Sequence, residues 1–151
     1  MIKEPIWTFK KFEELTVAEL YCILQLRSEV FVLEQHCVYL DADGRDQASY
    51  HLCGWLGNRL VAYCRILPPG LAYPEASIGR VITSPAHRKD GYGKTLMQKA
   101  IKKTYELFNV TTIKIGAQQY LLQFYGNLGF TPTGESYLED NIPHIAMLHQ
   151  R

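Results

Sequence analysis

The residues best suited to chemistry lie in one short segment, Arg88-Lys89-Asp90-Gly91-Tyr92-Gly93-Lys94. It follows an apolar run at 78–83 and precedes an amphipathic helical pattern, which predicts a loop between a strand and a helix. The first N–H groups of a helix have no internal partner, and the helix dipole places partial positive charge there. Gly91 and Gly93 let a phosphate approach the backbone closely, and Arg88 and Lys94 add positive charge. We therefore predict that this segment holds a pyrophosphate group.

Two well-known phosphate-binding motifs do not fit this segment. Gly93-Lys94-Thr95 imitates the end of a P-loop, but that motif needs a glycine where Arg88 stands, which argues against a P-loop phosphotransferase. The dinucleotide-binding fingerprint needs a small residue where Leu96 stands. What remains is an Arg-x-x-Gly-x-Gly pattern after a strand and a Ser84-Pro85 turn.

A second motif occurs later, in Gln123-Phe124-Tyr125-Gly126-Asn127-Leu128-Gly129-Phe130, where Gly129 is a natural helix-stopping residue. Together the two motifs resemble the GNAT N-acetyltransferase superfamily, in its coenzyme A loop and in its later aromatic-Tyr-x-x-x-Gly-Phe run. The resemblance covers roughly residues 15–149. In finer detail the chain resembles the ElaA-like branch, in the segments 26–35, 41–44, 78–81 and 140–145.

The resemblance implies transfer of an acetyl group from acetyl-CoA to a primary amine, by direct attack in a ternary complex. In the family, the strand that matches Val81, Ile82 and Thr83 pairs with the pantetheine arm, and a backbone N–H there polarises the thioester carbonyl. Tyr125 matches the usual general acid, and a phenol with a pKa of about 10 is protonated at neutral pH. The alternative for Tyr125 is a packed aromatic residue whose hydroxyl bonds to the backbone.

The motifs do not name a general base. An alkylamine with a pKa of about 10 is mostly ammonium at pH 7, so a histidine or carboxylate must take a proton from it, directly or through water. His144 on the closing strand is the first candidate, with core packing as the alternative. Glu34 is a further catalytic candidate and Glu29 a candidate for acceptor binding, because the first helical region often borders the acceptor cleft in this superfamily. Surface ion pairing is the alternative for both.

Four more residues could contact the acceptor. Arg65 and Arg80 lie inside apolar strands, where an arginine needs partners. Those partners could be Glu29 and Glu34 in buried ion pairs, or the acceptor itself. Gln118, at the end of a central strand, is placed to line the cleft where neighbouring strands part. Asp43 could hold a cationic acceptor or shape the turn at 41–44.

The elements that must position these residues follow from local patterns. Thr16 and Glu19 form a capping box that begins a helix. The runs Tyr50–Leu56 and Leu60–Leu67 flank Gly57-Asn58 and predict a hairpin, in which pairing outward from the turn places Cys53, Ala62 and Cys64 on one face. Both hairpin faces are apolar, so both should be covered. Further predicted elements are strands at 6–9, 78–83, 110–117, 131–138 and 142–149, a helix after the glycine loop and a helix at 119–128. We expect an α/β, single-domain GNAT-like fold over 1–151, with a mixed, mostly antiparallel central sheet and helices on both faces.

Composition narrows the class of protein. A chain of 151 residues fits one domain, and a net charge of +1 gives no general attraction to nucleic acid or anionic membrane. The four cysteines lack the spacing of a zinc pair or redox motif, so we expect no metal, and Cys53 and Cys64 should be core residues. No apolar run approaches membrane-spanning length and the N-terminus does not read as a signal peptide, so we expect a cytoplasmic enzyme that acts on a small-molecule or peptide amine, as a monomer or homodimer.

Two other functions fit parts of the sequence. A non-catalytic acyl-CoA-binding or sensor module would keep Arg88, Gly91 and Gly93, but it would need neither Tyr125 nor a base. The segment Arg27-x-x-Val30-Phe31 is similar to acyl-homoserine-lactone synthases, which use a related scaffold, although that family usually lacks so clear a coenzyme A loop.

Overall fold

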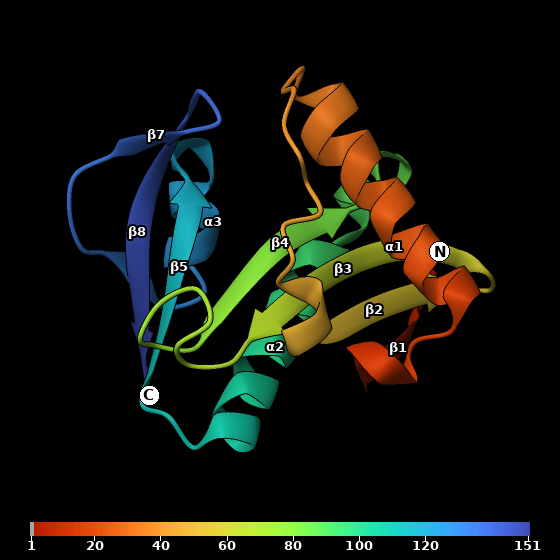
Figure 1. Cartoon of the computed structure of the whole chain (residues 1–151), viewed down its shortest axis with the longest axis horizontal. Coiled ribbons are helices and arrows are strands. Elements are labelled where there is room, and N and C mark those ends of the chain that lie inside the picture. The colour runs from red at the N-terminus through yellow and green to blue at the C-terminus, as the bar shows by residue number, and fades with distance from the viewer. Residues whose placement is uncertain (1) are drawn as a thin grey trace.

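The chain folds into two antiparallel sheets (Figure 1), and the computed structural model describes residues 2–151. In the first sheet the strands lie in the order β1 (Ile6–Lys11), β2 (Tyr50–Leu56), β3 (Arg59–Leu67) and β4 (Ser77–Thr83). In the second they lie in the order β5 (Thr112–Gln118), β8 (Ile142–Gln150) and β6 (Phe130–Pro132), and β7 (Tyr137–Glu139) also pairs with β8.

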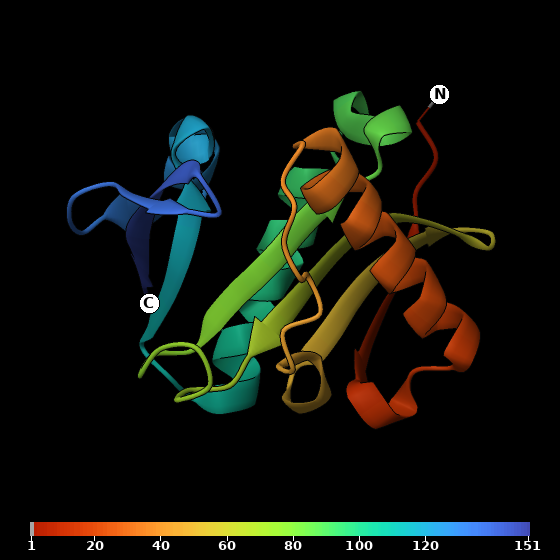
Figure 2. The same cartoon turned by 45° about the horizontal axis from the view of Figure 1, so that its top comes forward.

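Helices cover both faces of the first sheet, which confirms the predicted α/β architecture. The helix α1 (Val17–Arg27) begins at the predicted capping box, in which the Glu19 N–H donates to Thr16 Oγ1 at 3.1 Å and the Thr16 N–H donates to Glu19 Oε1 at 2.8 Å. It continues into a π-helical turn, Ser28–Glu34. The helix α2 (Tyr92–Phe108) lies on the opposite face, as Figure 2 shows. A short helix, α3 (Leu122–Gly126), precedes β6.

The hairpin of β2 and β3 forms around the predicted turn. The prediction of which side chains lie on the same face holds only for the residue pairs next to the turn and is wrong beyond them. The register shifts by one residue at Gly54 and Trp55, so Cys53 faces Tyr63 instead of Ala62. One extra residue in a strand turns every later side chain to the other face. As a result Cys53 and Tyr63 pack with α1, whereas Ala62 and Cys64 pack with α2. The prediction that Cys53 and Cys64 are core residues is confirmed, because both are buried.

Three predicted element boundaries also change. The strand predicted at 131–138 is two short strands, β6 and β7, with a break between them. The helix predicted at 119–128 is a 3-10 turn, Gln119–Leu121, followed by the five residues of α3. The strand predicted at 110–117 begins and ends later, as β5. Short connections with little regular pattern account for these differences.

The two sheets are joined by one isolated parallel β-bridge, between the residue that precedes β4 and a residue of β5. Ala76 pairs with Ile113 there, and the Lys114 N–H donates to the Ala76 carbonyl at 2.9 Å. Beyond this bridge the two strands diverge, so the sheets open like a wedge (Figures 1 and 2). Val81 near the end of β4 and Gln118 at the end of β5 line the same two cavities, which are described below.

Candidate active site

A cavity of about 610 Å³ lies between the end of β4, the start of α2 and the segment around α3. We call it the donor cavity. Its lining includes seven residues of the predicted cofactor site: Val81, Ile82, Thr83, Arg88, Gly91, Gly93 and Lys94. The structure thus brings the strand and the glycine loop to one cavity, as the sequence predicted.

The start of α2 is open for a ligand. Gly91 is the residue before the first turn, and its φ of 81° is a left-handed conformation that favours glycine. Among residues 2–151, no side chain caps this end of the helix, so the N–H groups of its first turn lack a side-chain partner there. A Cβ added to Gly93 would lie 3.5 Å from Thr83 Cγ2 and 3.7 Å from Phe124 Cζ, so a larger side chain there would meet the cavity wall.

Three residues of the predicted loop lie outside the lining of the donor cavity. Tyr92 is buried in the core, and its hydroxyl donates to the Lys3 carbonyl at 2.6 Å. Lys89 and Asp90 belong to the short 3-10 segment Pro85–Asp90 that precedes α2. The predicted role of these three residues in cofactor binding stays a prediction.

Glu34 lies at the donor cavity and is paired with Arg88. Arg88 donates from Nη1 to Glu34 Oε2 at 2.8 Å and from Nη2 to the other carboxylate oxygen. Both side chains are exposed, so solvent screens this pair. The pair links the π-helical turn to the glycine loop across the cavity. Glu29, on the same turn, is exposed and lines neither this cavity nor the next one.

A β-bulge interrupts β4 beside the donor cavity. The ladder pairs Arg65 with Gly79 and Tyr63 with Ile82, so two residues, Arg80 and Val81, stand opposite one. Arg80 has a φ of 50°, which is uncommon for a non-glycine residue. The extra residue of a bulge leaves backbone groups outside the ladder, and bulges are frequent next to active sites. No local pattern in the sequence indicates this bulge, although Val81 was among the predicted residues.

A second cavity, of about 180 Å³, lies between the two sheets. We call it the acceptor cavity. Its lining includes five of the predicted residues: Arg65, Arg80, Gln118, Tyr125 and His144. The two cavities share a wall, to which six residues contribute: Phe31, Gln35, Val81, Gln118, Leu121 and Tyr125.

Tyr125 is buried in the shared wall. Its ring packs edge-on against Phe124 and Phe130, with centroid separations of 5.1 and 5.9 Å. Within residues 2–151, no group forms a hydrogen bond with its hydroxyl. The alternative drawn from the sequence, a packed aromatic residue whose hydroxyl bonds to the backbone, therefore does not describe Tyr125. Burial raises the pKa of Tyr125 well above its usual value. Its hydroxyl therefore stays protonated at neutral pH and has its donor capacity free.

His144 has a geometry suited to a base. Its Nδ1 lies 2.7 Å from the Ile142 carbonyl, which can only accept, so Nδ1 carries the proton in the neutral ring. Nε2 is then the basic nitrogen, and it lies 3.6 Å from Glu139 Oε2. In the β5–β8 ladder His144 stands opposite Gln118, at the end of β5. The side chain is nearly buried and stacks on Tyr137.

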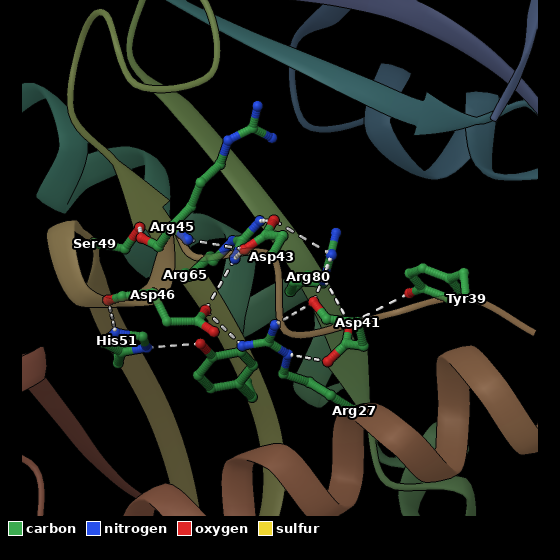
Figure 3. Close-up of polar contacts among 11 residues, drawn as sticks. Arg27, Tyr39, Asp41, Asp43, Arg45, Asp46, Ser49, His51, Arg65 and Arg80 are labelled. Carbon is green, nitrogen blue, oxygen red and sulfur yellow. Dashed lines mark hydrogen bonds and ion pairs between the residues drawn. The ribbon is translucent and has the colours of Figure 1, made fainter. Parts of the chain in front are cut away.

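A buried ion-pair network supports the first-sheet wall of the acceptor cavity (Figure 3). Arg27 is fully buried and donates to Asp41 at 2.7 Å and to Asp46 at 2.6 Å. Arg65 donates to Asp46 at 2.9 Å and also pairs with Asp43. Burial alone would raise the pKa of Asp46, but its hydrogen bonds and charge pairs with these arginines outweigh burial and lower it.

The network corrects the predicted partners of Arg65 and Arg80. Their carboxylates are Asp41, Asp43 and Asp46, rather than Glu29 and Glu34. Arg80 donates from Nε to Asp41 Oδ1 at 2.8 Å and from Nη2 to the Asp41 carbonyl at 3.0 Å. The signal was present in the sequence, because acidic residues at 41, 43 and 46 form a cluster in one polar loop.

Comparison with known proteins decides the family. The model of the acetyltransferase (GNAT) domain matches residues 27–150, a span that includes both motifs and both cavities. The chain belongs to the GNAT acetyltransferase family. This confirms the resemblance drawn from Arg88–Lys94 and from the segment around Tyr125. Within residues 2–151, the structure holds no group of three or more metal-ligating side chains, and no helix is long and apolar enough to cross a membrane.

Relatives within the family support the finer assignment to the ElaA-like branch. Protein ElaA of Escherichia coli K12 is 42% identical over 146 residues, which cover 95% of each chain. The crystal structure of E. coli ElaA has a TM-score of 0.91 at 40% identity, over 97% of this chain and 99% of that one. An acyl-CoA N-acyltransferase from Pseudomonas aeruginosa has a TM-score of 0.91 at 43% identity, over 96% and 99% of the two chains.

A more distant structure shares the fold alone. It is a CoA-dependent acyl-homoserine lactone synthase solved with SAM and isopentyl-CoA. Its TM-score is 0.80 at 18% identity, over 97% of this GNAT chain and 83% of that one.

Proposed function

We propose that this GNAT protein transfers an acetyl group from acetyl-CoA to a primary amine by direct attack in a ternary complex. One observation carries the proposal: the donor cavity and the acceptor cavity share a wall that contains Tyr125, Val81 and Gln118. Two reactants that occupy these cavities together would have their reacting ends at that wall. Holding them there converts a bimolecular encounter into an effectively unimolecular step.

The donor cavity fits a pyrophosphate-containing group at one end and an extended, peptide-like arm at the other. Gly91 and the uncapped first turn of α2 offer N–H donors, and Arg88 and Lys94 offer positive charge. Val81 and the end of β4 offer extended backbone along the same cavity. When bound, acetyl-CoA supplies an acetyl thioester whose C–S bond breaks as the acceptor nitrogen forms the new C–N bond.

Three features of the chain then perform separate tasks. His144 Nε2 takes a proton from the acceptor ammonium, and Glu139 beside it stabilises the imidazolium that results. A backbone N–H at the bulge around Val81 donates to the thioester carbonyl as negative charge develops on it. Tyr125 donates its hydroxyl proton to the departing thiolate. Because the pKa of Tyr125 is raised, its hydroxyl still carries that proton at neutral pH.

The test is calorimetric titration of the protein with acetyl-CoA, with ATP and NAD as controls. We expect micromolar binding of acetyl-CoA alone, followed by release of thiol when amines are added. Gly93→Asp should abolish binding, because its side chain would meet the cavity wall and place a negative charge at the phosphate end. Unchanged affinity of this variant, or a preference for ATP, would overturn the donor-cavity assignment. Binding without thiol release for any amine would indicate a sensor module instead.

A further inference from the structure

The two walls of the acceptor cavity carry opposite charges. On the side of the first sheet the lining includes three arginines, Arg45, Arg65 and Arg80. On the side of the second sheet the lining includes two acidic residues, Glu139 and Asp140, and the Glu139 carboxylate lies 3.6 Å from His144 Nε2. A cavity arranged in this way favours a ligand that carries both charges.

The charge of Arg45 is not neutralised by the buried ion-pair network. In that network Arg27, Arg65 and Arg80 face three carboxylates, those of Asp41, Asp43 and Asp46, so it is neutral without Arg45. Among the residues drawn in Figure 3, Arg45 forms hydrogen bonds through its backbone: its N–H donates to Asp43, and its carbonyl accepts from Ser49 Oγ at 2.7 Å. Figure 3 shows the Arg45 side chain extending away from the network, and within residues 2–151 no carboxylate pairs with it.

Arg65 adds positive charge to the same wall, but its guanidinium is already paired. Its side chain is 3% exposed and lines the acceptor cavity, and Nη1 and Nη2 are paired with aspartates. Its Nε has no partner among the described residues, but it is buried, so a ligand in the cavity would not reach it without a shift of the side chain. Among residues 2–151, Arg45 is therefore the arginine of this wall whose guanidinium has no carboxylate partner.

The volume of the acceptor cavity restricts the size of that ligand. About 180 Å³ is below the range of roughly 300–1,000 Å³ that is typical of sites for drug-sized molecules. The cavity therefore suits a compact molecule about the size of a single amino acid.

We infer that the acceptor carries a carboxylate as well as its amine, as free amino acids do. Arg45 holds the carboxylate, and the amine lies toward His144 and Glu139. Charge-assisted hydrogen bonds from guanidinium to carboxylate are strong and directional, so they would fix the orientation of the amine at the shared wall. The inference rests on the proposed function, because it names the class of acceptor for the same reaction.

The test compares amino acids with the amines that differ from them only by loss of the carboxylate. Lysine and cadaverine, histidine and histamine, and tyrosine and tyramine are matched pairs of this kind, within a panel of all twenty amino acids. For at least one pair we expect the wild-type kcat/KM to be roughly tenfold to a hundredfold higher for the amino acid than for the amine. Hydrogen bonds to a charged group typically contribute enough free energy for a factor of this size. In Arg45→Gln the ratio within that pair should fall by a similar factor, mainly through the KM of the amino acid.

Arg59→Gln is the matched control, since Arg59 is exposed in β3 and lines neither cavity. It should leave the ratio at its wild-type value. Acetylation of amines with no preference for the carboxylate-bearing member, or no turnover with any amino acid, would overturn this inference while leaving the proposed function in place. Failure to bind acetyl-CoA would overturn both.

Discussion

Tyr125→Phe separates a catalytic hydroxyl from a packed ring, because the substitution removes one oxygen atom and keeps the aromatic contacts. The ring packs against Phe124 and Phe130, and both contacts survive the change. Since the hydroxyl has no hydrogen-bond partner within residues 2–151, no buried partner loses a bond. The free energy of unfolding should therefore fall by less than the roughly 0.5–1.5 kcal/mol that a lost hydrogen bond typically costs.

The effect on turnover should be much larger. General acid catalysis contributes about 10²- to 10⁴-fold to a rate. Burial raises the pKa of Tyr125, which makes it a weaker acid, so the lower end of that range applies. We expect kcat to fall about a hundredfold, which corresponds to about 2.7 kcal/mol of transition-state stabilisation. The affinity for acetyl-CoA should stay close to the wild-type value.

The assay is thiol release at saturating acetyl-CoA, together with thermal unfolding of the same preparations. Tyr105→Phe is the matched control, because its hydroxyl bonds to His149 Nδ1 at 2.6 Å and lines neither cavity. This control should lose about 1 kcal/mol of stability and keep its turnover. If Tyr125→Phe kept wild-type turnover with an unchanged melting temperature, the hydroxyl would have no role as an acid.

Three further predictions concern charged groups. Asp46→Asn should lower the free energy of unfolding by about 3–5 kcal/mol in urea titrations, because Arg27 and Arg65 would lose a buried carboxylate. Since the pKa of Asp46 is lowered in the folded state, its stabilisation is present above the ordinary pKa of about 4 and is lost as pH falls through the native value. The wild-type protein should therefore lose more stability than the asparagine variant as pH falls below about 4, and equal losses would contradict the ion pair. Glu34→Gln should lower the KM for acetyl-CoA several-fold by releasing Arg88 for phosphate, whereas a loss of kcat would assign the base role to Glu34.

Local patterns predicted the features that depend on a few neighbouring residues. The capping box at Thr16 begins α1, and Gly129, predicted to stop a helix, has a left-handed φ of 98° after α3. The glycine loop and the segment around Tyr125 meet at one cavity, although they lie more than thirty positions apart. Their meeting followed from the family resemblance, since neither segment alone indicates where the other lies.

Features that depend on strand register or on a folded-back loop were not predictable. Because of the one-residue shift in the β2–β3 hairpin, Tyr63 lies on the sheet face that packs against α1. The turn residues near Gly57 do not indicate this shift. The bulge at Arg80 arises in the same way, from pairing between β3 and β4. The carboxylates of the ion-pair network come from a loop with little regular structure. Its path over the sheet, which brings Asp46 to Arg65, depends on tertiary packing alone.

The shared wall also makes acyl-chain length and acceptor size dependent on each other. An acyl group longer than acetyl would extend past Tyr125 and Leu121 into the space of about 180 Å³ that the acceptor needs. A substitution that widened this wall, at Phe31 for example, would enlarge the room for both partners at once. Selection for a longer acyl donor in this fold would therefore also change which amines fit beside it.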